Sequence, residues 1–260
     1  MNTFAQIDAN LKTLDCVQAA KPARPTLPEK PTEDEIADVV LYEIGSENLI
    51  GTRAGTMYWT GQHWKTLVAE QIRELVREIL RDLALPVRHT LLVNITSLIS
   101  DRVFDPDKIF NSSENHIVSV QNGDLLLIDG KWQLVPANRD RLRTAVLPHM
   151  YDPKAIAPRF MEFLDEIFEG DPDGHEKANL ILQHMGYALQ THSDFEKFAI
   201  YLGSGANGKS VLLNTLKHLL GPANIAAVQP SKLSNTFHRA SLNYKLANIV
   251  TESEQGAKLP

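Results

Sequence analysis

The stretch "YLGSGANGKSVLLNTL" (Tyr201–Leu216) decides the fold of the C-terminal part of this chain. Inside it, residues 203–210 fit the phosphate-binding pattern G-x-x-x-x-G-K-[ST]. The apolar run "KFAIYL" (197–202) predicts a strand that leads into the loop, and an apolar stripe over Val211–Leu220 predicts a helix that leads out of it. Strand, glycine loop and helix in this order are the context in which the pattern predicts a P-loop.

The residue types in this loop suit the binding of a nucleotide's phosphates. Glycines let the backbone curl so that its N–H groups point at phosphate oxygens, and the helix N-terminus adds the positive end of its dipole. We expect Lys209 to reach the β- and γ-phosphates of ATP and the Ser210 hydroxyl to bind Mg²⁺. A glycine-rich turn that matches the pattern by chance is the alternative. The predicted nucleotide-binding residues are Gly203, Ser204, Gly205, Ala206, Asn207, Gly208, Lys209, Ser210 and Val211.

An acidic strand end is the second requirement of a P-loop enzyme, because a carboxylate holds the magnesium shell and polarises the attacking water. The segment "KLANIVTESE" supplies one: residues 246–250 predict a strand, which follows an intervening strand at about 225–228, and two glutamates come after it. Which glutamate faces the metal stays open, and two surface glutamates in a loop are the alternative. The predicted catalytic residues are Lys209, Glu252 and Glu254, and the predicted metal ligands are Ser210 and Glu252.

Composition narrows the class of protein. The 260 residues are 22% charged and 43% hydrophobic with a net charge of −6, which is typical of a soluble globular protein of one or two domains and gives no global basic field for nucleic acid. We find no local basic patch either. Cys16 is the only cysteine, which excludes an internal disulfide and a cysteine-rich zinc site. The N-terminus does not resemble a signal peptide and no apolar run reaches about 18 residues, so we predict a cytoplasmic protein without a membrane segment.

The chain before the loop divides into three predicted parts. Residues 1–32 contain a short amphipathic helix and a spacer with a proline at every third position, which predicts a stiff extended segment or, alternatively, a docking site for a proline-reading partner. Residues 33–153 predict an α+β domain. Residues 154–192 predict two helices, the second with a capping box of Asp173 and Glu176. The elements expected in the α+β domain are short strands from Val39 to Trp64, a helix ended by Pro86, a helix at about 91–104, and a strand meander with hairpin turns at Asn122-Gly123 and Asp129-Gly130.

Five stretches of the sequence resemble a known family in their residues and in their order along the chain: "SVQNGDLLL", "LPHMYDPKAIAPRFMEFLDEI", "MGYALQ", "FAIYLGSGANGKSVLLNTLKHLLG" and "FHRASLNYKLANIVTESEQG". They resemble the helicase part of phage and plasmid primase-helicases, including the related poxvirus nucleoside triphosphatase. These are superfamily 3 helicases of the AAA+ class. The resemblance covers about residues 36–260, and Asn207 before Gly-Lys is more typical of this group than of small kinases or GTPases.

The resemblance implies a fold and a function. It implies an α+β N-terminal region with a helical collar (154–192), followed by a partial α/β P-loop domain of the AAA+ type (193–260). It also implies a homo-hexameric ring that hydrolyses ATP with Mg²⁺ between its subunits and moves on single-stranded DNA during replication. The sheet order of this class is 5-1-4-3-2, in which residues 197–202 would be strand 1 and residues 246–250 strand 3.

Departures from the family pattern limit the expected activity. The family continues past the acidic strand with strand 4, a sensor, a DNA-gripping β-hairpin and an arginine finger, and residues 253–260 are too few to contain them. We therefore expect weak ATP binding, little hydrolysis and no unwinding from this chain alone. One alternative stays open: a helicase-like protein that acts by binding ring subunits or replication partners through residues 36–190. A small P-loop kinase would need a lid with arginines after the acidic strand, and the sequence leaves no room for one.

Overall fold

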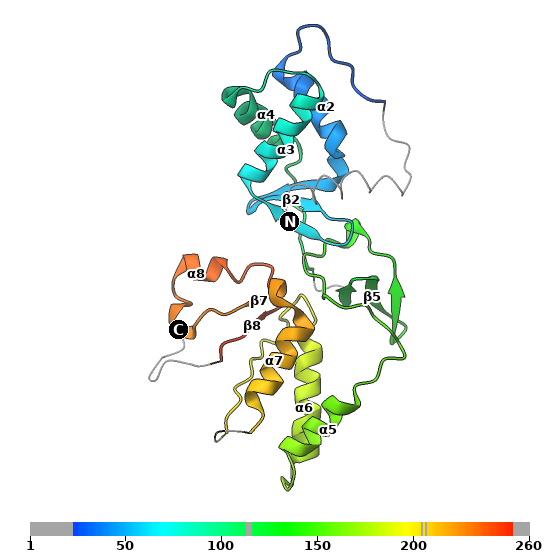
Figure 1. Ribbon diagram of the computed structural model, residues 1–260, viewed down its shortest axis with the longest axis vertical. Helices are drawn as coiled ribbons and strands as arrows, with labels where there is room; N and C mark the ends of the chain where they lie inside the picture. The colour runs from blue at the N-terminus through cyan, green and yellow to red at the C-terminus, as the bar shows by residue number, and fades with distance from the viewer. Residues whose placement is uncertain (1–22, 113–115, 204, 206, 252–260) are drawn as a thin grey trace. The chain divides into compact units, whose positions relative to one another are not determined.

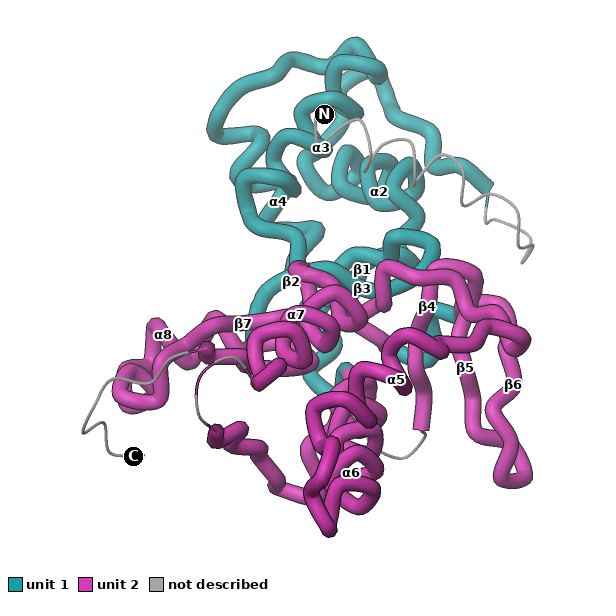
Figure 2. The backbone as a smooth tube through the Cα atoms, turned by 60° about the horizontal axis from the view of Figure 1, so that its bottom comes forward, with its two compact units in different colours: residues 1–110, 138–142 teal, residues 111–137, 143–260 magenta. Residues whose placement is uncertain are grey.

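The computed structural model describes residues 23–112, 116–203, 205 and 207–251. The helix expected within residues 1–32, Cys16, Ser204, Ala206, Glu252 and Glu254 lie outside the described residues. The chain forms two compact units (Figures 1 and 2). Unit 1 contains residues up to 110 together with 138–142, and unit 2 contains residues 111–137 and those from 143 onward.

In its described residues, unit 1 combines three helices with a three-stranded antiparallel sheet of order β1-β2-β3. Its hydrophobic core lies between the helices and extends to the sheet, and Ala37, Val40, Val76, Leu80, Ile95 and Ile99 are fully buried in it. The elements of unit 1 are α2 (Glu33–Ile44), the 3₁₀ turn η2 (Ser46–Asn48), β1 (Leu49–Thr52), β2 (Gly55–Trp59), β3 (Trp64–Leu67), α3 (Ala69–Asp82), α4 (His89–Arg102) and the 3₁₀ turn η3 (Arg139–Arg141).

Helix α2 corrects one expectation from the sequence. We predicted strands from Val39 onward, but residues 39–44 are helical and the strands begin only at Leu49. A capping box fixes the start of this helix: Glu35 N donates to Thr32 Oγ1 (3.3 Å) and Thr32 N donates to Glu35 Oε2 (2.8 Å). The buried side chains of α2 recur at helical spacing, which the run of β-branched residues concealed. The predicted helices at about 69–85 and 91–104 are confirmed as α3 and α4.

The described part of the proline-rich segment packs against the helices of unit 1. Residues 23–32 contain no helix or strand, as the proline spacing predicts. Leu27 is nevertheless half-buried against the core of unit 1, and Arg24 forms an ion pair with Glu43 on α2 (2.5 Å). The stretch from 23 to 32 is thus attached to the helices at these two points.

The turn between β2 and β3 makes unit 1 sensitive to acid. His63 contacts Thr60 Oγ1 through Nδ1 (3.1 Å), and burial together with the positive charge of Lys65 lowers the pKa of His63 from 6.5 to about 4. The unfolded chain therefore binds a proton that the folded chain excludes, so the stabilisation is present above pH 6.5 and is lost as the pH falls toward 4.

We expect the free energy of unfolding of unit 1 to fall by about 2 kcal/mol between pH 7 and pH 5 relative to a His63→Gln variant, measured by hydrogen exchange of unit 1 amides. Parallel pH profiles for the two proteins would contradict this.

Unit 2 opens with the predicted strand meander, an antiparallel sheet of order β4-β5-β6. The Asp129-Gly130 turn is confirmed, with φ of 50° and 73° at its two central residues. The other predicted turn is displaced by one residue: β5 starts at Gly123 opposite Val120, so the loop is Gln121-Asn122. Tertiary contacts explain the displacement, because the Asn122 side chain exchanges two hydrogen bonds with the backbone of Tyr151 (2.9 and 3.0 Å).

The core of unit 2 joins this sheet to three helices (Figure 1). It includes Leu164, which is fully buried on α5, and buried side chains of the meander and of α6 and α7. The remaining elements of unit 2 are β4 (Ile117–Val120), β5 (Gly123–Ile128), β6 (Lys131–Val135), α5 (Pro158–Ile167), α6 (Gly174–Tyr187), α7 (Lys209–Leu220), η4 (Pro222–Asn224), β7 (Ile225–Ala226), η5 (Pro230–Lys232), α8 (Thr236–Ala240) and β8 (Ala247–Asn248).

The two helices predicted within 154–192 are present, but the capping box is not. Asp173 is the N-cap of α6 and its side chain makes no capping hydrogen bond. Asp171 fixes the helix start instead: its carboxylate accepts from Asp173 N (2.9 Å) and pairs with Lys177 (2.5 Å), which lowers the pKa of Asp171. The turn before α6 therefore stabilises the N-terminal end of this helix. The spacing of Asp173 and Glu176 in the sequence did not indicate this.

The boundary between the units differs from the predicted division at residue 153. The segment after residue 143 pairs with the meander, since Leu147 N donates to Ser119 O (2.8 Å). It also holds the end of α7, because the buried Asn224 side chain donates to Val146 O and to Leu220 O (both 2.8 Å). Long-range hydrogen bonds of this kind place the meander with the C-terminal residues.

The predicted P-loop domain is only partly regular in the described residues. β7 and β8, which fall inside the strands expected at 225–228 and 246–250, pair in parallel. The strand expected at 197–202 does not form: the segment contains no helix or strand, and no described strand pairs with it. Three of its side chains stay exposed, Phe198 (73%), Ile200 (67%) and Leu202 (87%). A strand needs the hydrogen bonds of a neighbour, so an apolar run by itself does not produce one.

Candidate phosphate-binding site

The glycine loop ends against α5. Gly208 has φ 80°, a left-handed conformation that favours glycine, and it is the N-cap of α7. A Cβ on Gly208 would lie 2.7 Å from Ile167 Cγ2 and 3.1 Å from the Phe163 ring. Both the backbone conformation and the close approach to α5 therefore require glycine at this position. The helix predicted after the loop is confirmed and begins at Lys209.

Lys209 turns back into the loop. Its Nζ donates to Gly203 O (2.9 Å) and to Asn207 Oδ1 (2.6 Å). The ammonium therefore lies between the two ends of the glycine loop, at the N-terminal end of α7. A positive charge held beside a helix N-terminus is the arrangement that attracts an anion.

The other described residues of the predicted site, Gly205, Ser210 and Val211, are exposed. Ser210 is exposed in the first turn of α7, and Val211 is 54% exposed. Gly205 has open space around its Cα. The structure thus brings together Gly203, Asn207, Gly208 and Lys209, and it gives no position for Ser204, Ala206 or the two predicted acids.

Tyr201 fixes the chain that enters the loop. Its ring meets the His184 ring of α6 edge to face, with centroids 6.3 Å apart. Burial raises the pKa of the Tyr201 hydroxyl and lowers the pKa of His184. The loop is therefore connected to α6 at its start and to α5 at its end, and these are the two helices predicted within 154–192.

Local charge is the signal that our sequence analysis missed. Between Glu196 and Glu252 the chain contains no aspartate or glutamate. The same span contains six basic residues, which are Lys197, Lys209, Lys217, Lys232, Arg239 and Lys245. The net charge of the whole chain is negative and therefore does not indicate this segment. The segment is detected when charges are counted over short windows of the sequence. A uniformly positive segment around the loop favours an anionic ligand.

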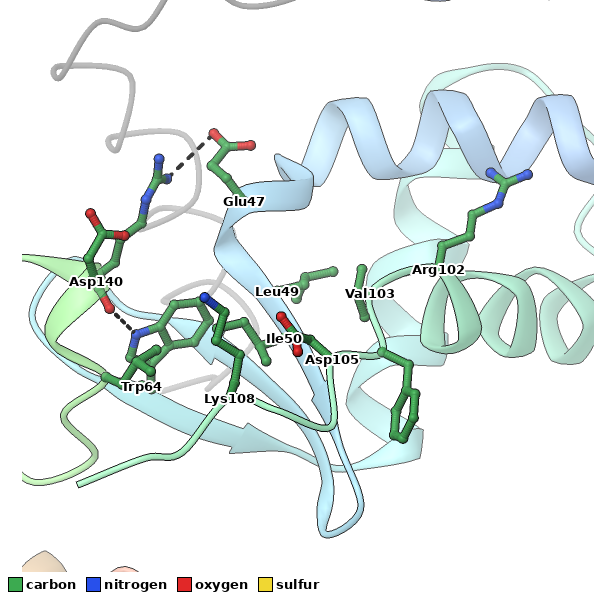
Figure 3. A pocket seen from close by; sticks show the side chains of 12 residues that line it. Glu47, Leu49, Ile50, Trp64, Arg102, Val103, Asp105, Lys108 and Asp140 are labelled. Atoms are coloured by element: carbon green, nitrogen blue, oxygen red, sulfur yellow. Dashed lines mark hydrogen bonds and ion pairs between the residues drawn. The ribbon is translucent and has the colours of Figure 1, made fainter. Parts of the chain in front are cut away.

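A hollow of about 600 Å³ in unit 1 differs from the glycine loop in its charges. Figure 3 shows its lining, where Arg139 forms an ion pair with Glu47 (3.8 Å) and its backbone carbonyl accepts from Trp64 Nε1 (2.8 Å). Arg102, also in the lining, pairs with Asp34 and Asp38 (2.7 and 2.6 Å). Its arginines already have carboxylate partners, so we do not assign a ligand to it.

The described part of the chain lacks two further features. No group of three or more histidine, cysteine, aspartate or glutamate side chains there is arranged to hold a metal ion. None of the helices in the described ranges combines the length and the apolar character that crossing a bilayer requires.

Comparison with known proteins supplies the family. The model of the family described as D5 N terminal like matches residues 37–169, just over half of the chain. This chain belongs to the D5 N-terminal-like family. That family is associated with the primase-helicases of phage and plasmid replication, so this part of the resemblance is confirmed.

The D5 N-terminal-like region runs from α2 to just beyond α5 and thus includes residues of both units. A second model, of a family of unknown function, matches residues 201–259, which include the glycine loop. No curated protein matches the chain.

Proposed function

We propose that this chain is the ATP-binding part of a superfamily 3 DNA helicase of phage or plasmid replication. The observation that carries the proposal is the position of the Lys209 ammonium inside a glycine loop at the start of α7. Membership of the D5 N-terminal-like family and the acid-free segment around the loop support it. In this proposal the fold is an α+β region with a helical collar followed by a P-loop domain of the AAA+ type.

The residues present fit a nucleotide's phosphates. The donors are the Lys209 ammonium and the N–H groups at the start of α7, and a triphosphate is the anion that such a donor set suits. Ser210 would contribute its hydroxyl to the Mg²⁺ that accompanies ATP, and Glu252 and Glu254 remain the proposed acids. Bound Mg²⁺–ATP supplies a transferable γ-phosphate, and this chain's own residues bind and orient it. Ring assembly and action on single-stranded DNA complete the proposal.

Removal of the Lys209 side chain tests it. A fluorescent ATP analogue titrated into the 260-residue chain with Mg²⁺ is expected to bind, and Lys209→Ala should weaken its binding about tenfold or more because a charge-assisted hydrogen bond to phosphate is lost. Lys217→Ala is the matched control, since Lys217 lies in the last turn of the same helix. It should bind as the natural chain does.

Two results would contradict the proposal. One is a natural chain that does not bind the analogue, and the other is equal affinity of Lys209→Ala and Lys217→Ala. The first result would favour the alternative in which the protein acts by binding replication partners.

A further inference from the structure

Asn207 lies inside the candidate site and has no role in the proposed function beyond its place in the motif. Its side-chain oxygen accepts from Lys209 Nζ at 2.6 Å. An ammonium only donates hydrogen bonds, so the amide oxygen must face Lys209 and the amide nitrogen must face the other way. On that other side is Gly203, where an added Cβ would lie 1.9 Å from Asn207 Nδ2. The amide group therefore packs against both Gly203 and Lys209.

This arrangement puts a neutral oxygen where the proposed function needs a phosphate oxygen. Lys209 Nζ donates to Asn207 Oδ1 and to Gly203 O, and both of these acceptors belong to the loop itself. A phosphate that enters the loop meets an ammonium that already donates to Asn207. A carboxamide oxygen attracts an ammonium less than a phosphate oxygen does, because it bears only a partial negative charge.

We propose that Asn207 is a positioning residue: its side-chain oxygen holds the Lys209 ammonium within the loop, as a stand-in for phosphate, and gives it up when phosphate binds. The inference rests on the proposed function, since it concerns the same site. Alanine at this position has no oxygen to hold the ammonium. Aspartate would hold the ammonium too strongly and would also repel phosphate, because it carries a full negative charge. Gly203 is the residue that leaves room for the amide.

Substitutions at Asn207 are therefore expected to change polyphosphate affinity in opposite directions. Isothermal titration of the 260-residue chain with tripolyphosphate should give about tenfold tighter binding for Asn207→Ala, because the internal competitor is gone. Asn207→Asp should bind about tenfold more weakly or worse. Asn214→Ala is the matched control, since Asn214 is exposed on α7, and its affinity should not change. A merely structural role for Asn207 would weaken binding in both variants.

A second readout does not depend on any ligand. Lys209 in Asn207→Ala should react about fivefold faster with an amine-acylating reagent than in the natural chain, measured by peptide mass spectrometry, because one of its acceptors is removed. In Asn207→Asp it should react more slowly.

The two readouts separate the inference from the proposed function. Faster labelling together with tighter binding supports both. Unchanged Lys209 labelling in Asn207→Ala, in a chain that binds tripolyphosphate, overturns the inference alone. Changed labelling in a chain that binds no polyphosphate overturns the proposed function and the stand-in role, and it leaves only a contact between Asn207 and Lys209.

Discussion

Replacement of Trp64 by alanine is expected to lower the free energy of unfolding of unit 1 by about 3–5 kcal/mol. Trp64 is 1% exposed, and its ring meets those of Trp59 and Phe110, each at a centroid distance of 5.8 Å. Its indole N–H donates to Arg139 O (2.8 Å). The substitution therefore leaves a large cavity and removes the hydrogen bond that ties residues 138–142 to β3.

Hydrogen exchange resolved by peptide measures this effect, because a chain of two units need not unfold in one step. Amides of α2–α4 and of residues 138–142 should exchange faster in Trp64→Ala, while α5 and α6 stay protected. Trp132→Ala is the matched control, since Trp132 is 42% exposed on β6, and its loss should cost much less. Similar losses for the two tryptophans would show that the burial of Trp64 does not stabilise unit 1 as expected.

Replacement of Gly123 by alanine should disrupt the meander of unit 2. Gly123 has φ 146°, which side-chain-bearing residues rarely adopt, and its added Cβ would lie 2.2 Å from the backbone oxygen of Val135. Backbone strain and this collision together predict a loss of roughly 3–5 kcal/mol. Because the meander pairs with the segment that holds the end of α7, protection of α7 amides should fall as well.

Gly130→Ala provides the control for that experiment. Gly130 also has a positive φ, 73°, but an added Cβ there meets no atom within 4 Å. Gly130→Ala should lower the free energy of unfolding only by the cost of a left-handed backbone at alanine, about 1–2 kcal/mol. If the two variants exchange alike, the approach of Val135 to Gly123 is not what requires glycine.

Local signals in the sequence predicted most helices and both turn regions of the meander. Helix α3 follows from one stripe of apolar residues, and the Asp129-Gly130 turn follows from residues that tolerate positive φ. The loop after residue 202 and the helix that begins at Lys209 follow from a motif whose spacing is fixed by the curl of the backbone. In each case the information lies within a few neighbouring residues.

Expectations failed where the deciding contact was distant in sequence. The predicted strands began at Val39, yet residues 39–44 are helical and bury apolar side chains in one core with α3 and α4. The Asn122 turn moved by one residue because its side chain bonds to Tyr151. The apolar run at 197–202 has strand composition, but it lacks a described neighbour to pair with.

The sequence by itself determined that a glycine loop with a lysine precedes a helix, because turn geometry and helix periodicity are local properties. Only the tertiary structure decided what surrounds that loop: α5 against Gly208, α6 against Tyr201, and the Asn207 amide against Gly203 and Lys209. These contacts depend on close packing between segments far apart in the chain or on side-chain directions within the loop, and no spacing in the sequence encodes either.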